Sequence, residues 1–314
     1  MSSVTIPNRV SSLGDYAFNG CSGLTSLKIG NRVTSIGNYV FAGCNSLSTV
    51  TIPDSVTSIG DYVFSGCSGL TSVEIGKGVE RIGYRVFDKC INLTSINVSN
   101  DNPYYLSYEG VLFNKKDKDC ILIQYPCGKQ GDYMVPYCIT SIGDAAFFDC
   151  TKLSNISINN NVTSIGVNTF RGCTNLVSIN IPVYNNLTII GDGAFYGCTS
   201  LVSVTIPNHV TGIGVFAFYG CTSLISVVIP DGITTIGNCT FENCSSLTSV
   251  TIPDSVTFIG SEAFASCEKL NTIIYNGTKE QWRKTVRKGS NWCIMVQAKV
   301  VICKGDNTTV SIWI

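Results

Sequence analysis

The sequence predicts a β-rich solenoid built from repeats of about 23 residues, and three observations support this fold class. A cysteine recurs at a nearly constant spacing along most of the 314-residue chain. Around each of these cysteines, phenylalanine stands three residues before, leucine three after and glycine seven before. Hydrophobic residues make up 44% of the chain and charged residues 13%, which supplies a core and little surface charge. These register cysteines are Cys21, Cys44, Cys67, Cys90, Cys150, Cys173, Cys198, Cys221, Cys244 and Cys267.

Each repeat is expected to form one coil. In the copy "SVTSIGDYVFSGCSGLTSVEIG", residues 55–76, the last part alternates apolar and polar residues, which predicts a short strand with one buried face. Proline or glycine ends the strand, a polar turn reverses the chain, and a second extended piece follows at 56–59. Gly60 indicates either a positive φ or a close approach of neighbouring coils. The following residues are too few for a stable helix, so we expect a helical or 3₁₀ turn that points Phe64 and Cys67 inward.

A single coil cannot bury enough apolar surface to offset its own ordering entropy. Coils must therefore stack, with short parallel strands about 4.8 Å apart, into a right-handed solenoid whose stability belongs to the array.

The segment "IPDSVTSIGDYVFSGCSGLTSV" resembles the BspA-like leucine-rich repeat family, and the resemblance covers nearly the whole chain. It implies a leucine-rich-repeat solenoid and surface proteins of anaerobic bacteria and parasitic protists that adhere to host proteins or cells. One departure is that proline or glycine replaces the usual asparagine ladder after the strand, so the tight horseshoe curvature does not carry over.

The repeat breaks in two places. Between Cys90 and Cys150 the segment "YEGVLFNKKDKDCILIQYP" predicts strands at 110–113 and 121–125, which form a β-hairpin projecting from its coil. Similar segments are frequent in BspA-like proteins. We therefore expect a solenoid over residues 1–275, with the insertion at about 100–132.

The second break is the C-terminal segment, residues 276–314, which resembles a cap of the same family. Residues 280–288 are expected to form a short helix and 299–303 a last strand. Trp282 and Trp292 are interpreted as packing residues of this cap, because the last coil of a solenoid must be covered.

The cysteines are interpreted as structure. Those in the register lie between Phe and Leu, where cysteine behaves as a small buried hydrophobe. In an oxidising compartment, Cys127 with Cys138 or Cys293 with Cys303 could form disulfides, and both options stay open. Zinc is disfavoured, because the chain has no C-x-x-C motif and a single histidine.

Composition argues against several classes of function. The single histidine, His209, is expected to be a solvated turn residue, which leaves no catalytic triad and predicts a protein that is not an enzyme. We expect no metal and no cofactor. Because the formal net charge is zero, nucleic acid is an unfavourable partner. No apolar run approaches the ~20 residues that span a bilayer, so no membrane insertion is expected.

The beginning "MSSVTIPNRV" lacks the features of a secretory signal and already carries the end of a repeat. We therefore expect that the sequence starts inside a longer protein at the cell surface or secreted, with a cytoplasmic location as the alternative. The chain also holds nine N-x-S/T sequons, most of which chance explains in a composition this rich in Asn, Ser and Thr.

The leading functional hypothesis is a non-catalytic adhesion module that binds protein, such as a host extracellular-matrix or cell-surface protein, through its concave sheet. The alternative is an intracellular or periplasmic scaffold without an external ligand. Val228 and Ile274 are the apolar exceptions in the outward row and the candidate anchors. The outward strand positions are Lys28, Thr51, Glu74, Asn97, Ser157, Asn180, Thr205, Val228, Thr251 and Ile274, and the binding candidates among them are Thr51, Glu74, Asn97, Asn180, Thr205, Val228 and Thr251.

Overall fold

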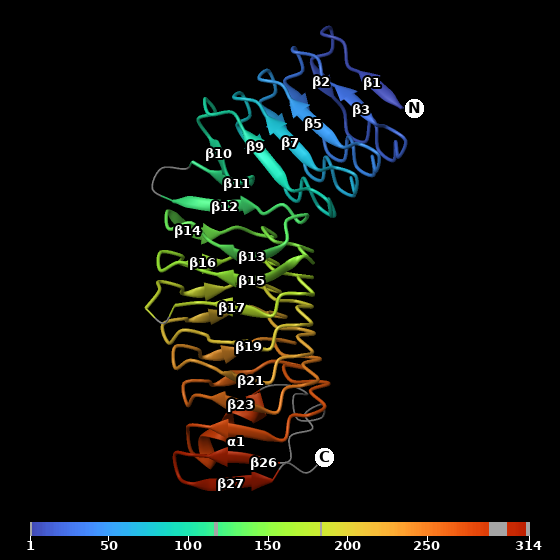
Figure 1. Ribbon diagram of the computed structural model, residues 1–314. Coiled ribbons are helices and arrows are strands. Elements are labelled where there is room, and N and C mark those ends of the chain that lie inside the picture. The colour runs from blue at the N-terminus through green and yellow to red at the C-terminus, as the bar shows by residue number, and fades with distance from the viewer. Residues whose placement is uncertain (1, 116–118, 183, 289–299, 312–314) are drawn as a thin grey trace. The chain divides into compact units, whose positions relative to one another are not determined.

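The computed structural model describes residues 2–115, 119–182, 184–288 and 300–311. It divides into two compact units, here called unit 1 (1–130 with 147–152) and unit 2 (131–146 with 153–314). Within each unit the strands lie one beside the other in coil after coil (Figure 1). The chain is therefore a β-solenoid, as its sequence predicts. The division into a solenoid over 1–275 and a cap over 276–314 stays a prediction.

Each regular coil of unit 1 contributes one longer and one shorter strand. The longer strands are β1 (Ser3–Thr5), β3 (Ser26–Lys28), β5 (Thr49–Ile52), β7 (Ser72–Ile75) and β9 (Ser95–Val98). They form a two-stranded and a three-stranded parallel sheet, β1-β3 and β5-β7-β9, paired in register, for example Thr51 with Glu74 and Glu74 with Asn97. The two-residue strands form another parallel sheet of β2 (Ser12–Leu13), β4 (Ser35–Ile36), β6 (Ser58–Ile59) and β8 (Arg81–Ile82).

Unit 2 repeats this plan. Its nine-stranded long-strand sheet consists of β13 (Gly131–Met134), β15 (Leu153–Ser157), β17 (Ser178–Asn180), β19 (Ser203–Val204), β21 (Ser226–Val228), β23 (Ser249–Ile252), β25 (Thr272–Tyr275), β26 (Val300–Cys303) and β27 (Thr308–Ser311). The shorter strands are β14 (Ile139–Ile142), β16 (Ser164–Ile165), β18 (Ile189–Ile190), β20 (Gly212–Ile213), β22 (Thr235–Ile236) and β24 (Phe258–Ile259).

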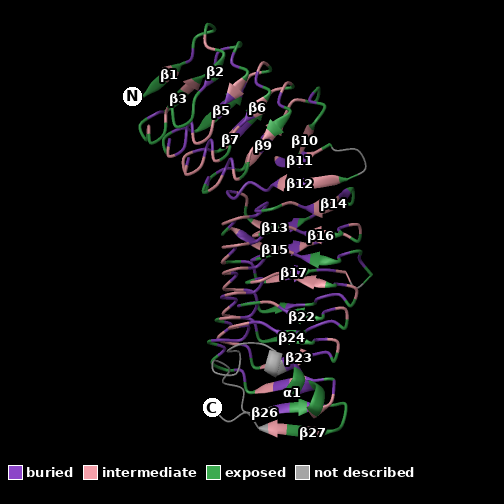
Figure 2. Cartoon of the chain, turned by 180° about the vertical axis from the view of Figure 1, so that it is seen from behind, coloured by how far each residue is buried: buried purple, intermediate pink, exposed green. Residues whose placement is uncertain are grey.

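The repeat residues fill the core as predicted. Phenylalanine rings of successive coils stack, with centroids 5.6 Å apart between Phe41 and Phe64 and 5.2 Å between Phe218 and Phe241. Buried segments recur in coil after coil (Figure 2). Of the register cysteines, Cys21 alone is half-buried, because its turn is the first phenylalanine–cysteine turn of the repeat and such a turn packs on it from one side only. The others are buried.

The glycine of the repeat allows close stacking. Gly60 does not have a positive φ, but a Cβ built on it would lie 2.7 Å from the backbone carbon of Gly37 on the preceding coil. Of the two interpretations of this glycine, the close approach is therefore confirmed. One residue further on, a ladder missed by sequence reasoning links the coils: the Asp61 amide donates to Asn38 Oδ1, 2.8 Å away.

The segment after this glycine forms consecutive turns instead of a helix. Its i→i−3 hydrogen bonds, such as Ala42 N to Tyr39 O at 3.2 Å, are those of a 3₁₀ turn. Tyr39 and Gly43, however, have φ values of 54° and 74°, in the left-handed region. These residues prevent a helical turn from continuing, because a right-handed helix needs negative φ at every position.

The predicted hairpin is present, but the expectation that it projects is wrong. Strand β11 (Val111–Asn114) pairs antiparallel with β12 (Cys120–Gln124), and also with β10 (Tyr105–Tyr108), a strand missed from the sequence. Leu112 is fully buried and belongs to the main core of unit 1. The hairpin packs inward because Val111, Leu112 and Phe113 are apolar in succession, so both faces of β11 need cover.

The hairpin also occupies hydrogen-bonding groups at the strand edges of unit 1. The amide of Ile96 in β9 donates to Gly110 O at 2.8 Å, and that of Val98 donates to Ser107 Oγ at 2.9 Å. On the shorter strands, the amide of Ile82 donates to the Tyr105 hydroxyl at 3.2 Å. Side chains and a turn of the hairpin thus replace the next coil.

Near the C-terminus of unit 2 the predicted helix is present as α1 (Lys279–Lys288). Trp282 is 2% exposed, and its ring centroid lies 5.2 Å from that of Tyr275, as expected of a packing residue. The predicted last strand is β26, and β27 follows it antiparallel. Trp292 and Cys293 lie outside the described residues, so the proposed Cys293–Cys303 disulfide stays a prediction.

Candidate binding surface

The outward side of the long-strand sheet, here the long-strand face, carries the predicted binding residues. In unit 1 the predicted row runs through Lys28, Thr51, Glu74 and Asn97. The first three are exposed and Asn97 is half-buried, because its Nδ2 donates to Glu74 Oε1 at 2.8 Å. This stretch of the row is polar and carries charge at Lys28 and Glu74. Two of its side chains, Glu74 and Asn97, hydrogen-bond each other.

In unit 2 the same row is more apolar. Asn180 and Thr205 are exposed and Thr251 is half-buried, so all the predicted candidates face solvent at least in part. Val228 is 62% exposed, and Ile274 is half-buried in the same row. Strand pairing adds two residues to this row that the sequence did not reveal. Met134 pairs with Ser157 and is 75% exposed, and Ile302 pairs with Ile274 and is 39% exposed.

A second apolar column was also missed. Val177, Val202 and Ile225 follow the repeat leucine on three successive coils and are 45%, 39% and 50% exposed. Backbone hydrogen bonds join them, from Val202 N to Val177 O at 3.2 Å and from Ile225 N to Val202 O at 3.1 Å. We call these three residues together with Val228 the aliphatic strip.

Other coils place a hydroxyl in the column of the aliphatic strip. Thr25, Thr71 and Thr248 each donate through Oγ1 to a carbonyl of the preceding coil, at 2.9, 3.0 and 3.1 Å. Valine and isoleucine keep the branched shape but replace this hydroxyl with a methyl group in water. The change from threonine to aliphatic residues along this column was the signal in the sequence.

Unit 1 presents a stacked tyrosine column on its turns. Tyr16, Tyr39 and Tyr62 have ring centroids 5.0 and 4.9 Å apart with nearly parallel planes. Their ring faces cover one another, so a sugar or peptide cannot stack on the inner faces. Two cavities of about 350 and 510 Å³ flank Tyr105, but that hydroxyl is occupied by the Ile82 amide.

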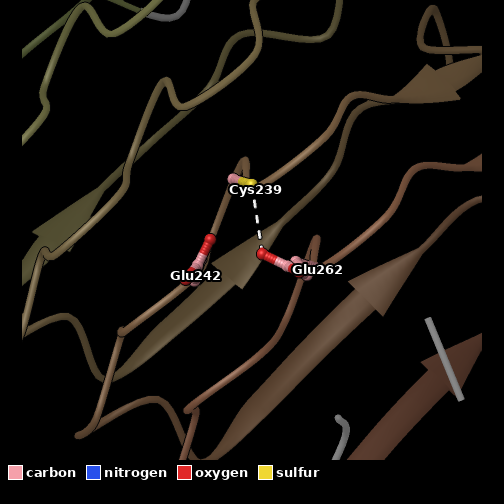
Figure 3. A group of neighbouring side chains, drawn as sticks. All are labelled: Cys239, Glu242 and Glu262. Atoms are coloured by element: carbon pink, nitrogen blue, oxygen red, sulfur yellow. Dashed lines mark hydrogen bonds between the residues drawn. The ribbon is translucent and has the colours of Figure 1, made fainter. Parts of the chain in front are cut away.

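One group of side chains on unit 2 has the composition of metal ligands (Figure 3). The ligand atoms of Cys239, Glu242 and Glu262 lie within 4.8 Å of one another, and the Cys239 thiol points toward Glu262 Oε2 at 3.9 Å. Burial and the two carboxylates raise the pKa of Cys239 to about 12. The thiol therefore stays protonated at neutral pH, which makes it a poor nucleophile.

His209 lies in a turn, as expected, but it is only partly exposed. Its Nε2 lies 2.6 Å from Oδ1 of the buried Asn185. Asn185 Oδ1 also accepts the Leu187 amide at 3.1 Å, so the pair stabilises a turn.

Fold and repeat define a leucine-rich-repeat solenoid, and the chain belongs to the family described as BspA type Leucine rich repeat region. Its family model matches residues 1–108, 125–185 and 175–291 in six copies. No match is found among curated proteins. Members of this repeat class are generally non-catalytic.

Solved structures of bacterial repeat proteins are similar to the chain. A leucine rich cell surface protein of Faecalibacterium prausnitzii is 29% identical, with 90% of this chain and 81% of that one covered and a TM-score of 0.59. A leucine-rich repeat protein of Eubacterium ventriosum is 26% identical, with 100% and 79% covered and a TM-score of 0.65. The pneumococcal vaccine antigen PcpA, 21% identical over 92% and 77% at a TM-score of 0.72, shares the fold.

Proposed function

We propose that this chain is a non-catalytic protein-binding module of a cell-surface protein, and that it binds its partner through the long-strand face of unit 2. Membership of the BspA-type family and similarity to a protein described as a cell surface protein support the location. Among the described elements, no helix combines the length and apolarity needed to cross a bilayer. The partner is a protein, such as an extracellular-matrix or host cell-surface protein.

The aliphatic strip is the observation that carries the proposal. Contiguous apolar side chains left in water mark interaction sites, and each is worth about 1.5–3 kcal/mol when it becomes fully buried. Three successive coils carry Val177, Val202 and Ile225 in a column where the other regular coils carry Thr, Ser or Asn. Nearby Thr205 and Thr251 offer hydroxyls but no charge, so the strip fits an uncharged, apolar segment of the partner.

The test returns the strip to the residue that other coils use. In the triple variant Val177→Thr, Val202→Thr, Ile225→Thr, each side chain stays branched at Cβ. Immobilised extracellular-matrix extract serves as the probe, and binding is measured by surface plasmon resonance. We expect at least tenfold weaker binding than wild type, because apolar contact worth about 1.4 kcal/mol or more is lost.

The matched control is Ile189→Thr, which removes a 51% exposed isoleucine from β18 on the other sheet. It should bind like wild type. If the triple variant binds as tightly as wild type, or if the control loses as much affinity as the triple variant, the partner does not bind at the long-strand face. A wild-type chain that binds neither the extract nor epithelial cells would contradict the adhesive function itself.

A further inference from the structure

In regular coils the register thiol is held by the coil before it. Cys67 Sγ donates to Phe41 O at 3.1 Å, and Cys90 Sγ donates to Phe64 O at the same distance. The acceptor is the carbonyl of the repeat phenylalanine on the preceding coil, as also for Cys244 with Phe218 at 3.2 Å. This contact turns each sulfur toward a carbonyl of the neighbouring coil.

The coil formed by the end of the hairpin breaks this pattern. Cys127 lies one repeat length before Cys150 and so occupies the cysteine position of the preceding coil, but Gln124 stands where the repeat has phenylalanine. Cys150 Sγ lies 3.8 Å from Tyr125 O and 3.9 Å from Phe148 O. It lies only 2.7 Å from Cys127 Sγ.

We propose that Cys127 and Cys150 form a disulfide when the chain folds under oxidising conditions. Their sulfur atoms are within about 0.7 Å of the S–S bond length of 2.03–2.05 Å, and stacked coils place Cα atoms in the range that a disulfide spans. Both residues belong to unit 1, Cys127 to its segment 1–130 and Cys150 to its segment 147–152. The bond would join these two segments covalently.

The pairing differs from the disulfide suggested by the sequence. Cys138 was the partner considered for Cys127, but Cys138 is exposed, whereas Cys127 is 4% exposed and faces Cys150. The Phe148 carbonyl, 3.2 Å from Cys127 Sγ, helps to orient that sulfur toward the Cys150 side of the coil.

The oxidant is a small-molecule disulfide such as oxidised glutathione. One protein thiolate attacks it, which forms a mixed disulfide and releases one glutathione thiolate; the second protein thiolate then displaces the other. In total two protein thiols lose two electrons and two protons, and two molecules of reduced glutathione form. Because both sulfurs are buried, the exchange takes place before the coil closes, and the finished bond is shielded from reductants.

The test uses the double variant Cys120→Ser, Cys138→Ser, in which the tryptic peptides 119–129 and 130–152 each contain a single cysteine. The full chain is refolded with oxidised and reduced glutathione, alkylated and digested without reductant. We expect one cross-linked peptide pair by mass spectrometry, and a melting temperature several degrees above that of the same protein refolded with dithiothreitol.

The complementary protein adds Cys127→Ser to the double variant, so that peptide 119–129 holds no cysteine. Its melting temperature should be the same after both refolding procedures. Recovery of the double variant with both thiols alkylated, or an equal rise in melting temperature on oxidative refolding of this triple variant, would overturn the proposal.

Discussion

The regular coils of unit 1 and the hairpin that follows them both supply hydrogen-bond acceptors and apolar side chains to the neighbouring coil. They do so with different chemical groups. A regular coil offers its neighbour backbone carbonyls in register and a column of apolar side chains. The hairpin runs antiparallel, yet it supplies acceptors through the Ser107 and Tyr105 hydroxyls and core volume through Leu112. A solenoid thus tolerates an irregular segment where that segment bonds the free backbone amides of the last coil and fills the core beside it.

The sharpest way to break this comparison is to remove core volume from the hairpin. Leu112→Ala should lower the free energy of unfolding by about 2–5 kcal/mol, as for a fully buried leucine in a regular coil. Urea denaturation measures the change. Tyr108→Ala, at a 58% exposed position of the same hairpin, is the control and should cost less than about 0.5 kcal/mol. A projecting hairpin would make the two variants equivalent.

Close backbone approach is the second shared feature. A Cβ on Gly60 would lie 2.7 Å from the Gly37 backbone, and one on Gly110 would lie 2.9 Å from Ser95 Cα at a φ of 76°. We expect Gly60→Ala and Gly110→Ala each to destabilise by about 1–3 kcal/mol in thermal or urea unfolding. Gly14→Ala, where no atom lies within 4 Å, should be nearly neutral. Should Gly14→Ala cost as much, close approach between neighbouring coils would not explain these glycines.

The buried thiols of the regular coils give the smallest effect. Burial raises the pKa of Cys67 to about 12 and that of Cys44 to about 11. The folded chain keeps these protons when the unfolded chain, with thiol pKa values near about 8.5, releases them. Stability is therefore full below about pH 8.5 and falls as the pH rises toward the folded pKa values.

Between about pH 7.5 and 9.5 the wild-type protein should lose about 1 kcal/mol more stability than Cys67→Ala, measured by urea unfolding at each pH. Parallel losses in both proteins would mean that the Cys67 thiol is accessible to water. The exposed Cys138 offers an internal check, since maleimide should label it in the native protein well before Cys67.

The core columns were predictable because stacking imposes one residue type at each inward position, and the same pattern recurs in ten copies. The hairpin strands were located to within a residue or two. Its orientation was missed because the run Val111, Leu112, Phe113, which lacks the alternation of a one-sided strand, was not taken as a sign of burial on both faces.

The candidate site was only partly predictable. Thr205, Val228 and the other outward residues were placed correctly toward solvent, since strand alternation fixes which side chains point outward. Val202 and its column lie just before the strand, where alternation gives no signal. Cys127 and Met134 each lie 23 residues before a residue of a regular coil, Cys150 and Ser157, and this spacing was the signal that could have found them. It was missed because Gln124 replaces the repeat phenylalanine in their coil.

The bonds from each coil to the one before it have an evolutionary consequence. The Asp61 amide, the Thr71 hydroxyl and the Cys67 thiol all find their acceptors one coil earlier, so interior coils that keep these residues both offer and accept the same set of contacts. Unequal crossing-over between two copies in the gene adds or deletes a whole coil without orphaning a polar group. Such a protein can therefore gain or lose solenoid length by whole coils while the remaining coils still fold.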